Sequence, residues 1–191
     1  MLQYDDLISI PSIECSEPLV KVSSTSSTIM VSPINGDMQP CTGDEIYLRA
    51  GAYKRLEDVS VNLGSLIPGA TIKLVYGYRH PDIQMRYFKE KFLEISKQNP
   101  GFSELQCTRC VHELIASPDV AGHPTGGAVD VTIIQDGLEL DMGTKIWDLR
   151  SIEQIPTFSA KISKEQSKNR MILREIMMEA EYAPFDGEWW H

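Results

Sequence analysis

The sequence predicts a single α+β domain in which a central antiparallel sheet is flanked by helices. Apolar residues recur at helical spacing in three segments, two further segments read as strands, and the two kinds do not alternate regularly. The length of 191 residues suits one domain, with 42% apolar and 24% charged residues. We expect residues 1–43, rich in Ser, Thr and Pro, to wrap around a core formed by residues 44–191.

The first predicted elements are a helix over residues 44–60 and a strand over residues 71–78. In the helix, Thr42 or Asp44 can supply the cap. The strand reads "TIKLVYGY", after a turn at "SLIPGA". The apolar face of the helix consists of Ile46, Tyr53, Leu56 and Val59.

Three elements are predicted in the rest of the chain. Residues 81–101 form a second helix that "NPG" ends, and residues 101–121 are irregular or contain short elements. Residues 127–143, "GAVDVTIIQDGLELDMG", form a strand, a turn at Asp136-Gly137 and a short return strand. A last helix covers residues 163–181.

Composition narrows the classes of function. With 27 acidic and 18 basic residues the net charge is −9, which argues against a large nucleic-acid surface. No apolar run approaches the roughly 20 residues of a membrane span, and no secretion signal is visible. We expect a cytoplasmic protein, or a periplasmic one if a leader was removed. We expect its four cysteines to be mostly reduced, because a chain of this length does not need disulfides and no export signal is visible. Cys107 and Cys110 in "CTRCVH" lack the second pair that a structural zinc site requires.

The stretch "GHPTGGAVDVTI" suggests a metal site. Asp130 lies in a predicted strand and needs a positive partner if it is buried. His123 precedes it across a Gly-rich turn, and zinc accepts both imidazole and carboxylate ligands. A third ligand is available at His191 in "GEWWH", where Glu188 can serve as a base that takes a proton from water.

Each of these signals has an ordinary alternative. A histidine in a loop is often a surface residue, and an aspartate in a strand often marks an edge or a bulge. "EWWH" alone could be an aromatic corner of the core. Glu188 and His191 are three residues apart, so they converge only if the backbone bends between them. The combined pattern is far less expected by chance than any one member.

The sequence resembles the zinc D,D-peptidases, a superfamily with the hedgehog-like fold. The resemblance is carried by His123-x-x-Gly126-x-Ala128-x-Asp130 and the distant Glu188-x-Trp190-His191. The double-Trp form "EWWH" is similar to D-alanyl-D-alanine dipeptidases of the vancomycin-resistance type. "YGYRHP", "ELDMGTKIWD" and "NRMILREIMMEAEY" agree in order and spacing, over roughly residues 44–191.

The resemblance implies a metallopeptidase with one Zn²⁺ per chain, held by His123, Asp130 and His191. It implies that Glu188 activates the zinc-bound water and later returns the proton to the leaving amine. It also implies that Arg79, with zinc, stabilises the oxyanion. The implied reaction is hydrolysis of D-Ala-D-Ala or a similar short peptide.

Asp148 is a candidate for binding the free ammonium group of the substrate, although its alignment slips by about one residue, and Tyr78 is a further candidate contact. The expected partner is a small dipeptide or a muropeptide, with no nucleic acid and no membrane, and the oligomeric state stays open.

Two departures keep alternatives open. Tyr76 stands where the family has Asp, and Ala121 where it usually has Ser. Both changes fall among groups that hold the amino end of a dipeptide. A D,D- or L,D-carboxypeptidase acting on longer peptidoglycan peptides is therefore one alternative. A catalytically inactive zinc-binding interaction domain is the other, but it has no need for both Glu188 and Arg79.

Overall fold

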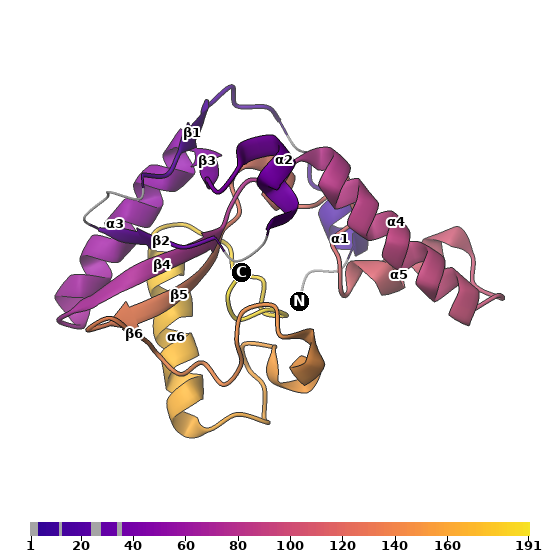
Figure 1. The fold of residues 1–191 in the computed structure, drawn as a ribbon. Coiled ribbons are helices and arrows are strands. Elements are labelled where there is room, and N and C mark those ends of the chain that lie inside the picture. The colour runs from indigo at the N-terminus through magenta and orange to yellow at the C-terminus, as the bar shows by residue number, and fades with distance from the viewer. Residues whose placement is uncertain (1–3, 12, 24–27, 34–35) are drawn as a thin grey trace.

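The computed structural model describes residues 4–11, 13–23, 28–33 and 36–191. Its main sheet has the strand order β2-β4-β5-β6 (Figure 1). The strands are β2 (Ile29–Val31), β4 (Ala70–Tyr76), β5 (Asp130–Gln135) and β6 (Leu138–Glu139). Helices accompany the sheet, so the predicted α+β class is confirmed.

The sheet is mixed rather than wholly antiparallel. β4 pairs antiparallel with β5, and β5 with β6, as the turn at Asp136-Gly137 predicts. β2 instead runs parallel to β4. The chain between them is long enough for the crossover that a parallel pair requires. This pairing is non-local, which is why the sequence pattern did not reveal it.

A second sheet replaces the start of the first predicted helix. β3 (Tyr47–Arg49) pairs antiparallel with β1 (Leu19–Lys21), and helix α3 then covers Ala50–Leu66. The prediction of a helix over residues 44–60 was therefore wrong at both ends. Its apolar face was real, since Leu56 and Val59 are fully buried, but the pairing with β1 holds residues 47–49 extended.

The other helices fall near their predicted places. α4 (Pro81–Gln98) begins at Pro81 with His80 as its cap, and α6 (Lys164–Glu179) begins with a capping box between Ser163 and Gln166. α4 and α5 extend together to one side of the molecule (Figure 1). The remaining helical elements are α1 (Tyr4–Ile8), η1 (Gly36–Met38), α2 (Gln39–Thr42), α5 (Glu104–His112), η2 (His123–Thr125) and η3 (Leu149–Gln154).

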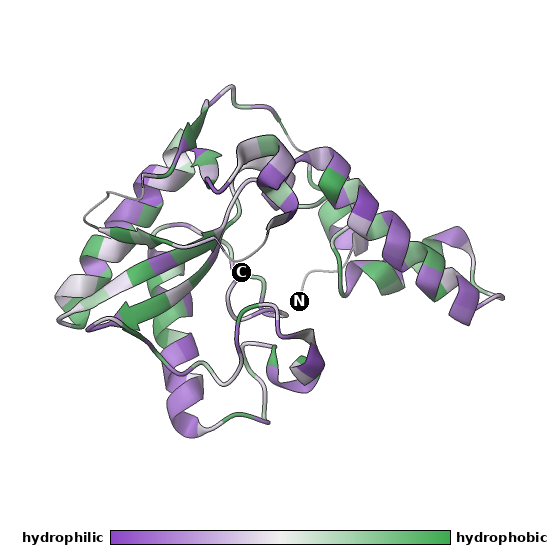
Figure 2. Cartoon of the chain, in the orientation of Figure 1, coloured by the Kyte–Doolittle hydropathy of each residue, from purple (hydrophilic) through white to green (hydrophobic). Residues whose placement is uncertain are grey.

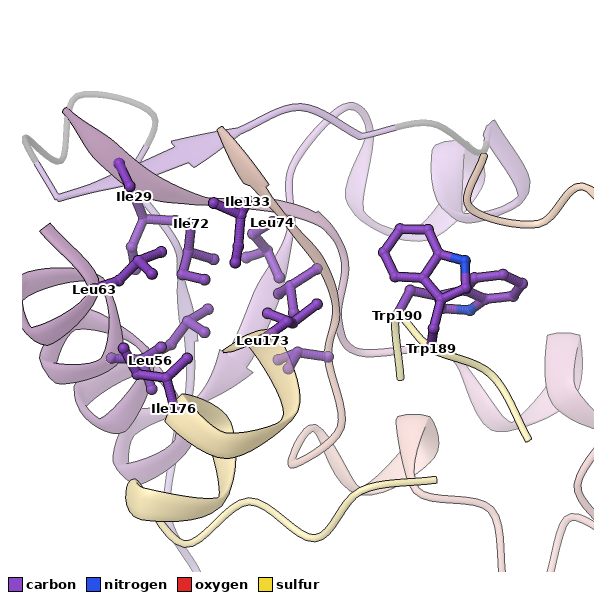
Figure 3. Packing of buried hydrophobic residues seen from close by; sticks show 14 of the residues in the cluster. Ile29, Leu56, Leu63, Ile72, Leu74, Ile133, Leu173, Ile176, Trp189 and Trp190 are labelled. Carbon is purple, nitrogen blue, oxygen red and sulfur yellow. The ribbon is translucent and has the colours of Figure 1, made fainter. Parts of the chain in front are cut away.

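The hydrophobic core lies between the main sheet and the two helices α3 and α6. Figure 3 shows side chains of both helices meeting those of β2, β4 and β5, with Trp189 and Trp190 to one side. Colouring by hydropathy shows the apolar residues concentrated in the main strands (Figure 2). The labelled members are Ile29, Leu56, Leu63, Ile72, Leu74, Ile133, Leu173 and Ile176. This packing holds the strand ends that carry the site.

Within the part of the chain that the structure describes, every helix is too short or too polar to cross a bilayer.

Candidate metal centre

The site forms where β4 ends and β5 begins. Tyr76 and Asp130 are cross-strand partners, and the register of the β4–β5 pairing shifts between Leu74 and Tyr76. The residues that follow β4 therefore lie beside the first residue of β5. Asp130 is only 1% exposed, so other groups must compensate for the hydration that its carboxylate has lost.

Two histidines face this carboxylate. Oδ1 of Asp130 lies 3.4 Å from Nε2 of His123 and 3.1 Å from Nδ1 of His191. One ligand atom from each of the three residues lies within 4.8 Å of the other two. The fold thus brings together three side chains that the sequence separates by up to 68 residues, counting from His123 to His191.

This donor set fits zinc. In tetrahedral zinc sites, bonds of about 2.0–2.1 Å place neighbouring ligand atoms about 3.3 Å apart, close to the two separations at Asp130. Two nitrogens and one carboxylate oxygen leave a fourth coordination position open. Three protein ligands and one open position are typical of catalytic zinc, whereas structural zinc has four protein ligands.

A second layer of contacts orients two of the three clustered residues. Nδ1 of His123 lies 2.8 Å from the carbonyl oxygen of Gly77, to which it donates, and this leaves Nε2 to face Asp130. Nε1 of Trp147 donates to Oδ2 of Asp130 at 3.0 Å, so that Oδ1 faces the two imidazoles. Gly77 has no room for a side chain, because a Cβ there would lie 2.7 Å from the carbonyl oxygen of Tyr47.

The turn that carries His123 is held by β3. The backbone N–H of Arg49 donates to the carbonyl of Gly126 at 2.8 Å, and its Nε donates to that of Thr125 at 2.8 Å. Gly126 has a φ of +76°, in the left-handed region that favours glycine. A Cβ at this position would also lie 2.4 Å from Cδ2 of Leu19. The Gly-rich stretch therefore provides both the bend and the close approach to β1 and β3.

The residues from Glu188 to His191 form a turn. The backbone therefore bends between these two residues, as their convergence on one cavity requires. The N–H of His191 donates to the carbonyl of Glu188 at 3.1 Å. The carbonyl of Trp190 accepts from the N–H of Val131 at 3.0 Å, which ties the turn to the start of β5. Trp190 is 1% exposed. Trp190 thus anchors in the core the turn that carries His191.

Glu188 and Arg79 line the same cavity as the three clustered residues. The cavity has a volume of about 960 Å³ and reaches from α6 to α1 and α5. Arg79 donates from Nε to the hydroxyl of Tyr76 at 3.0 Å and from Nη1 to Oε1 of Gln84 at 2.8 Å. The guanidinium is thus fixed beside the site by two neutral acceptors.

The electrostatics separate the two carboxylates. Burial raises the pKa of Glu188 to about 7, and the nearby charge of Asp130 adds to the effect. Burial also acts to raise the pKa of Asp130, but the imidazoles of His123 and His191 outweigh it and hold that pKa well below its usual range. One carboxyl group is therefore suited to exchanging a proton and the other to staying ionised.

Other residues singled out from the sequence lie elsewhere. Asp148 accepts from Nε of Arg150 at 2.8 Å and lines a shallow hollow, apart from the cavity with His123. Tyr78 packs against a small cluster that includes Met38 and Ile83. Cys107 is buried and Cys110 half-buried on α5. The structure does not bring these residues into the group around Asp130.

Sequence reasoning did not identify Trp147, Gly77 or Arg49 as supports of the site. Trp147 and Gly77 lie in "KIWD" and "YGYRHP", two motifs whose charged residues Asp148 and Arg79 are the predicted site residues. Arg49 was placed inside a helix. Its contact with the turn at Thr125 spans 76 residues of sequence, and no local pattern signals it.

Two imidazoles and a carboxylate around one point, with a separate half-buried glutamate in the same cavity, define a metal-dependent hydrolase. A family model described as D-Ala-D-Ala dipeptidase (peptidase family M15) matches residues 93–191, just over half of the chain. The match contains the three clustered residues and Glu188. The chain belongs to this family of metallopeptidases.

Two individual proteins are similar to it. A D-alanyl-D-alanine dipeptidase of Synechocystis sp. is 26% identical over 212 aligned residues, covering 96% of this chain and 84% of the relative. A solved structure of a variant of the vancomycin-resistance D,D-pentapeptidase VanY, in complex with Zn(II), is 17% identical with a TM-score of 0.33. That match covers 72% of this chain and 85% of the other. The family assignment rests on the sequence match.

Proposed function

We propose that this protein is a zinc-dependent dipeptidase that hydrolyses D-Ala-D-Ala or a similar short peptide containing D-amino acids. The observation that carries the proposal is a single cavity lined by His123, Asp130 and His191 together with Glu188 and Arg79. The first three would hold the metal. When bound, zinc supplies Lewis acidity, which polarises a peptide carbonyl and lowers the pKa of water.

Glu188 moves the proton in this scheme. Its carboxylate takes a proton from the attacking water as the new C–O bond forms at the peptide carbonyl carbon. It then gives that proton to the leaving nitrogen as the C–N bond breaks, so that two free amino acids result. The burial that raises the pKa of Glu188 to about 7 brings it closer to the working pH, as such a role requires. A bound cation would lower that pKa again, because opposite charge favours the ionised form.

Arg79 stabilises the negative charge that develops on the carbonyl oxygen. It lines the cavity beside Glu188 and has donors left after bonding to Tyr76 and Gln84. A donor aimed at such an oxyanion contributes about 3–4 kcal/mol to catalysis. The matched family region begins at residue 93, so this role for Arg79 is supported by its position alone.

The substrate is proposed from the named relative and the family. The Synechocystis relative is a D-alanyl-D-alanine dipeptidase, which favours the dipeptide. The size of the cavity supports a second candidate, a carboxypeptidase for longer peptidoglycan peptides. Its volume of about 960 Å³ lies at the upper end of the range for small-ligand sites. Asp148 and Tyr78 remain proposed substrate contacts, although neither lines the cavity that contains His123.

The deciding experiment compares zinc-loaded wild type with Glu188→Gln. We expect the variant to keep its zinc, measured by elemental analysis, and to lose D-Ala release from D-Ala-D-Ala by a factor of about 100 or more. Glu179→Gln, an exposed glutamate on α6, is the matched control and should stay fully active. Turnover that survives in Glu188→Gln would refute the assigned base. Release from a pentapeptide but not from the dipeptide would establish the second candidate instead.

A further inference from the structure

We infer that Tyr76 and Asp37 are positioning residues that orient Arg79 towards the substrate while leaving its positive charge unneutralised. The inference rests on the proposed role of Arg79 as the donor to the carbonyl oxygen. A chain of hydrogen bonds runs from Asp37, in the N-terminal part of the protein, through Tyr76 to the guanidinium of Arg79. The members come from η1, the end of β4 and the segment that follows β4.

The direction of the hydrogen bonds follows from chemistry. Nε of Arg79 can only donate, so the hydroxyl oxygen of Tyr76 accepts from it at 3.0 Å. The single hydroxyl proton of Tyr76 is then directed to Oδ2 of Asp37 at 2.8 Å. Tyr87 donates to the same carboxylate oxygen at 2.9 Å. A phenol carries one proton and also accepts, so the hydroxyl of Tyr76 can accept from Arg79 and donate to Asp37 at the same time.

A second, independent contact fixes the other edge of the guanidinium. Nη1 of Arg79 donates to Oε1 of Gln84 at 2.8 Å, and Nε2 of Gln84 donates to the carbonyl of Ala116 at 2.7 Å. Gln84 is 1% exposed. The guanidinium carbon also lies 4.8 Å from the ring centre of Tyr76 and 5.6 Å from that of Tyr87. Arg79 is therefore held on two edges and against two rings.

The acceptors in direct contact with Arg79 are both neutral. Among the residues that the structure describes, Arg79 forms no ion pair, and the nearest carboxylate in the chain of bonds is one phenol away at Asp37. A carboxylate in direct contact would offset much of the field that Arg79 exerts on the cavity. The phenol of Tyr76 thus links Arg79 to Asp37, which fixes the orientation of the guanidinium, and it keeps the negative charge of Asp37 away from Arg79.

Tyr76 acts through Arg79 and not on the substrate. Its side chain is 4% exposed and does not line the cavity, whereas Arg79 does. The ring of Tyr76 also packs edge-on against His123, with ring centres 5.2 Å apart, and against Trp147, at 4.9 Å. Tyr76→Phe keeps these ring contacts and removes only the hydroxyl, so it isolates the hydrogen-bonded chain.

The test begins with kinetics on zinc-loaded protein. We expect Tyr76→Phe to lower kcat about 10- to 100-fold, as loss of a supporting hydrogen bond does at other sites, with KM and zinc content within about threefold of wild type. Asp37→Asn should lower kcat less, since the phenol can still accept from Arg79. Tyr47→Phe removes a hydroxyl that donates to Glu45, away from Arg79, so it is the matched control and should stay within about twofold.

A double-mutant cycle separates a positioning role from a general structural one. Arg79→Ala alone should lower kcat about 100- to 1000-fold. In that background Tyr76→Phe should have no further effect. If Arg79→Ala is harmless, the proposed function of Arg79 fails. If Arg79→Ala is damaging but Tyr76→Phe is not, or if the two losses simply multiply, the inference about Tyr76 is overturned and the role of Arg79 stands.

A measurement without turnover completes the test. In metal-free protein labelled with ¹⁵N, the Nε proton of Arg79 should exchange slowly with water, because it is bonded to Tyr76. In Tyr76→Phe it should exchange at least tenfold faster, while other arginine signals keep their wild-type rates. An unchanged exchange rate would show that the hydroxyl of Tyr76 does not hold Arg79.

Discussion

Replacing Trp147 by Phe should weaken zinc binding without unfolding the protein. Nε1 of Trp147 donates to Oδ2 of Asp130 at 3.0 Å, and Asp130 is 1% exposed. Phe keeps an aromatic ring next to Tyr76 but loses the donor. The carboxylate of Asp130 can then rotate, and Oδ1 no longer faces His123 and His191 in a fixed orientation.

The magnitude follows from this one bond. A hydrogen bond to a charged acceptor contributes about 1.5–3 kcal/mol, which corresponds to about 10- to 150-fold in a binding constant. The bond exists with and without metal, so this range is an upper limit for the effect on affinity. Loss of comparable supporting contacts weakens metal sites about 10- to 100-fold. We therefore expect the zinc dissociation constant of Trp147→Phe to rise by about that factor.

The assay is competition with a chromophoric chelator at constant pH, with circular dichroism to check that the fold is kept. Trp189→Phe is the matched control, because Nε1 of Trp189 donates at 2.8 Å to the neutral hydroxyl of Thr144. Its zinc affinity should stay within about threefold of wild type. The reasoning is refuted if Trp147→Phe binds zinc as tightly as wild type, or if both substitutions weaken binding equally.

Three further predictions concern stability. Arg170 is fully buried and donates to the carbonyls of Met142 and Pro156 at 2.7 Å each. Arg170→Met should therefore lower the free energy of unfolding in urea by about 3 kcal/mol, whereas Arg150→Met, at an exposed position, should lower it by less than about 0.5 kcal/mol. Burial lowers the pKa of His112 below its unfolded value, so metal-free protein should lose stability as pH falls from 7 to 5, because the unfolded chain then binds more protons. His112→Asn should flatten that dependence, and equal slopes would contradict the assignment. If free zinc is kept at 100 times its dissociation constant, removing it should lower the free energy of unfolding by about 2.7 kcal/mol and Tm by about 5–10 °C. An unchanged Tm would show that the folded protein does not bind the metal preferentially.

Local patterns were sufficient for the elements whose side-chain periodicity is long and regular. α4, α6, the pair β4 and β5, and the turn at Asp136-Gly137 lie close to their predicted positions. Their boundaries are set by capping residues, Pro and Gly, which act within a few residues. The segment at Tyr47–Arg49 differed because its pairing with β1 depends on residues 26 to 30 positions away. A helical pattern of apolar residues could not exclude a short strand at its start.

The candidate site likewise has features that the sequence reveals and features that only the structure reveals. Its chemistry is visible in the sequence, because imidazole, carboxylate and guanidinium groups stand in motifs that resemble a known family. Its support is not visible, because Trp147, Gly77, Arg49 and Asp37 act on residues 17 to 76 positions away in the chain. Those contacts depend on where loops meet in space.

The sequence by itself predicted the α+β class, the family and the candidate side chains for binding a metal and moving a proton, since residue types and the motifs they form carry this information. Only the tertiary structure decided that Oδ1 of Asp130 lies 3.1 Å and 3.4 Å from two imidazole nitrogens, and that Arg79 is held by neutral partners. The physical reason is that the energies of metal binding and of charge stabilisation depend on distances of a few ångströms between groups remote in sequence. The packing of α3 and α6 on the sheet sets those distances.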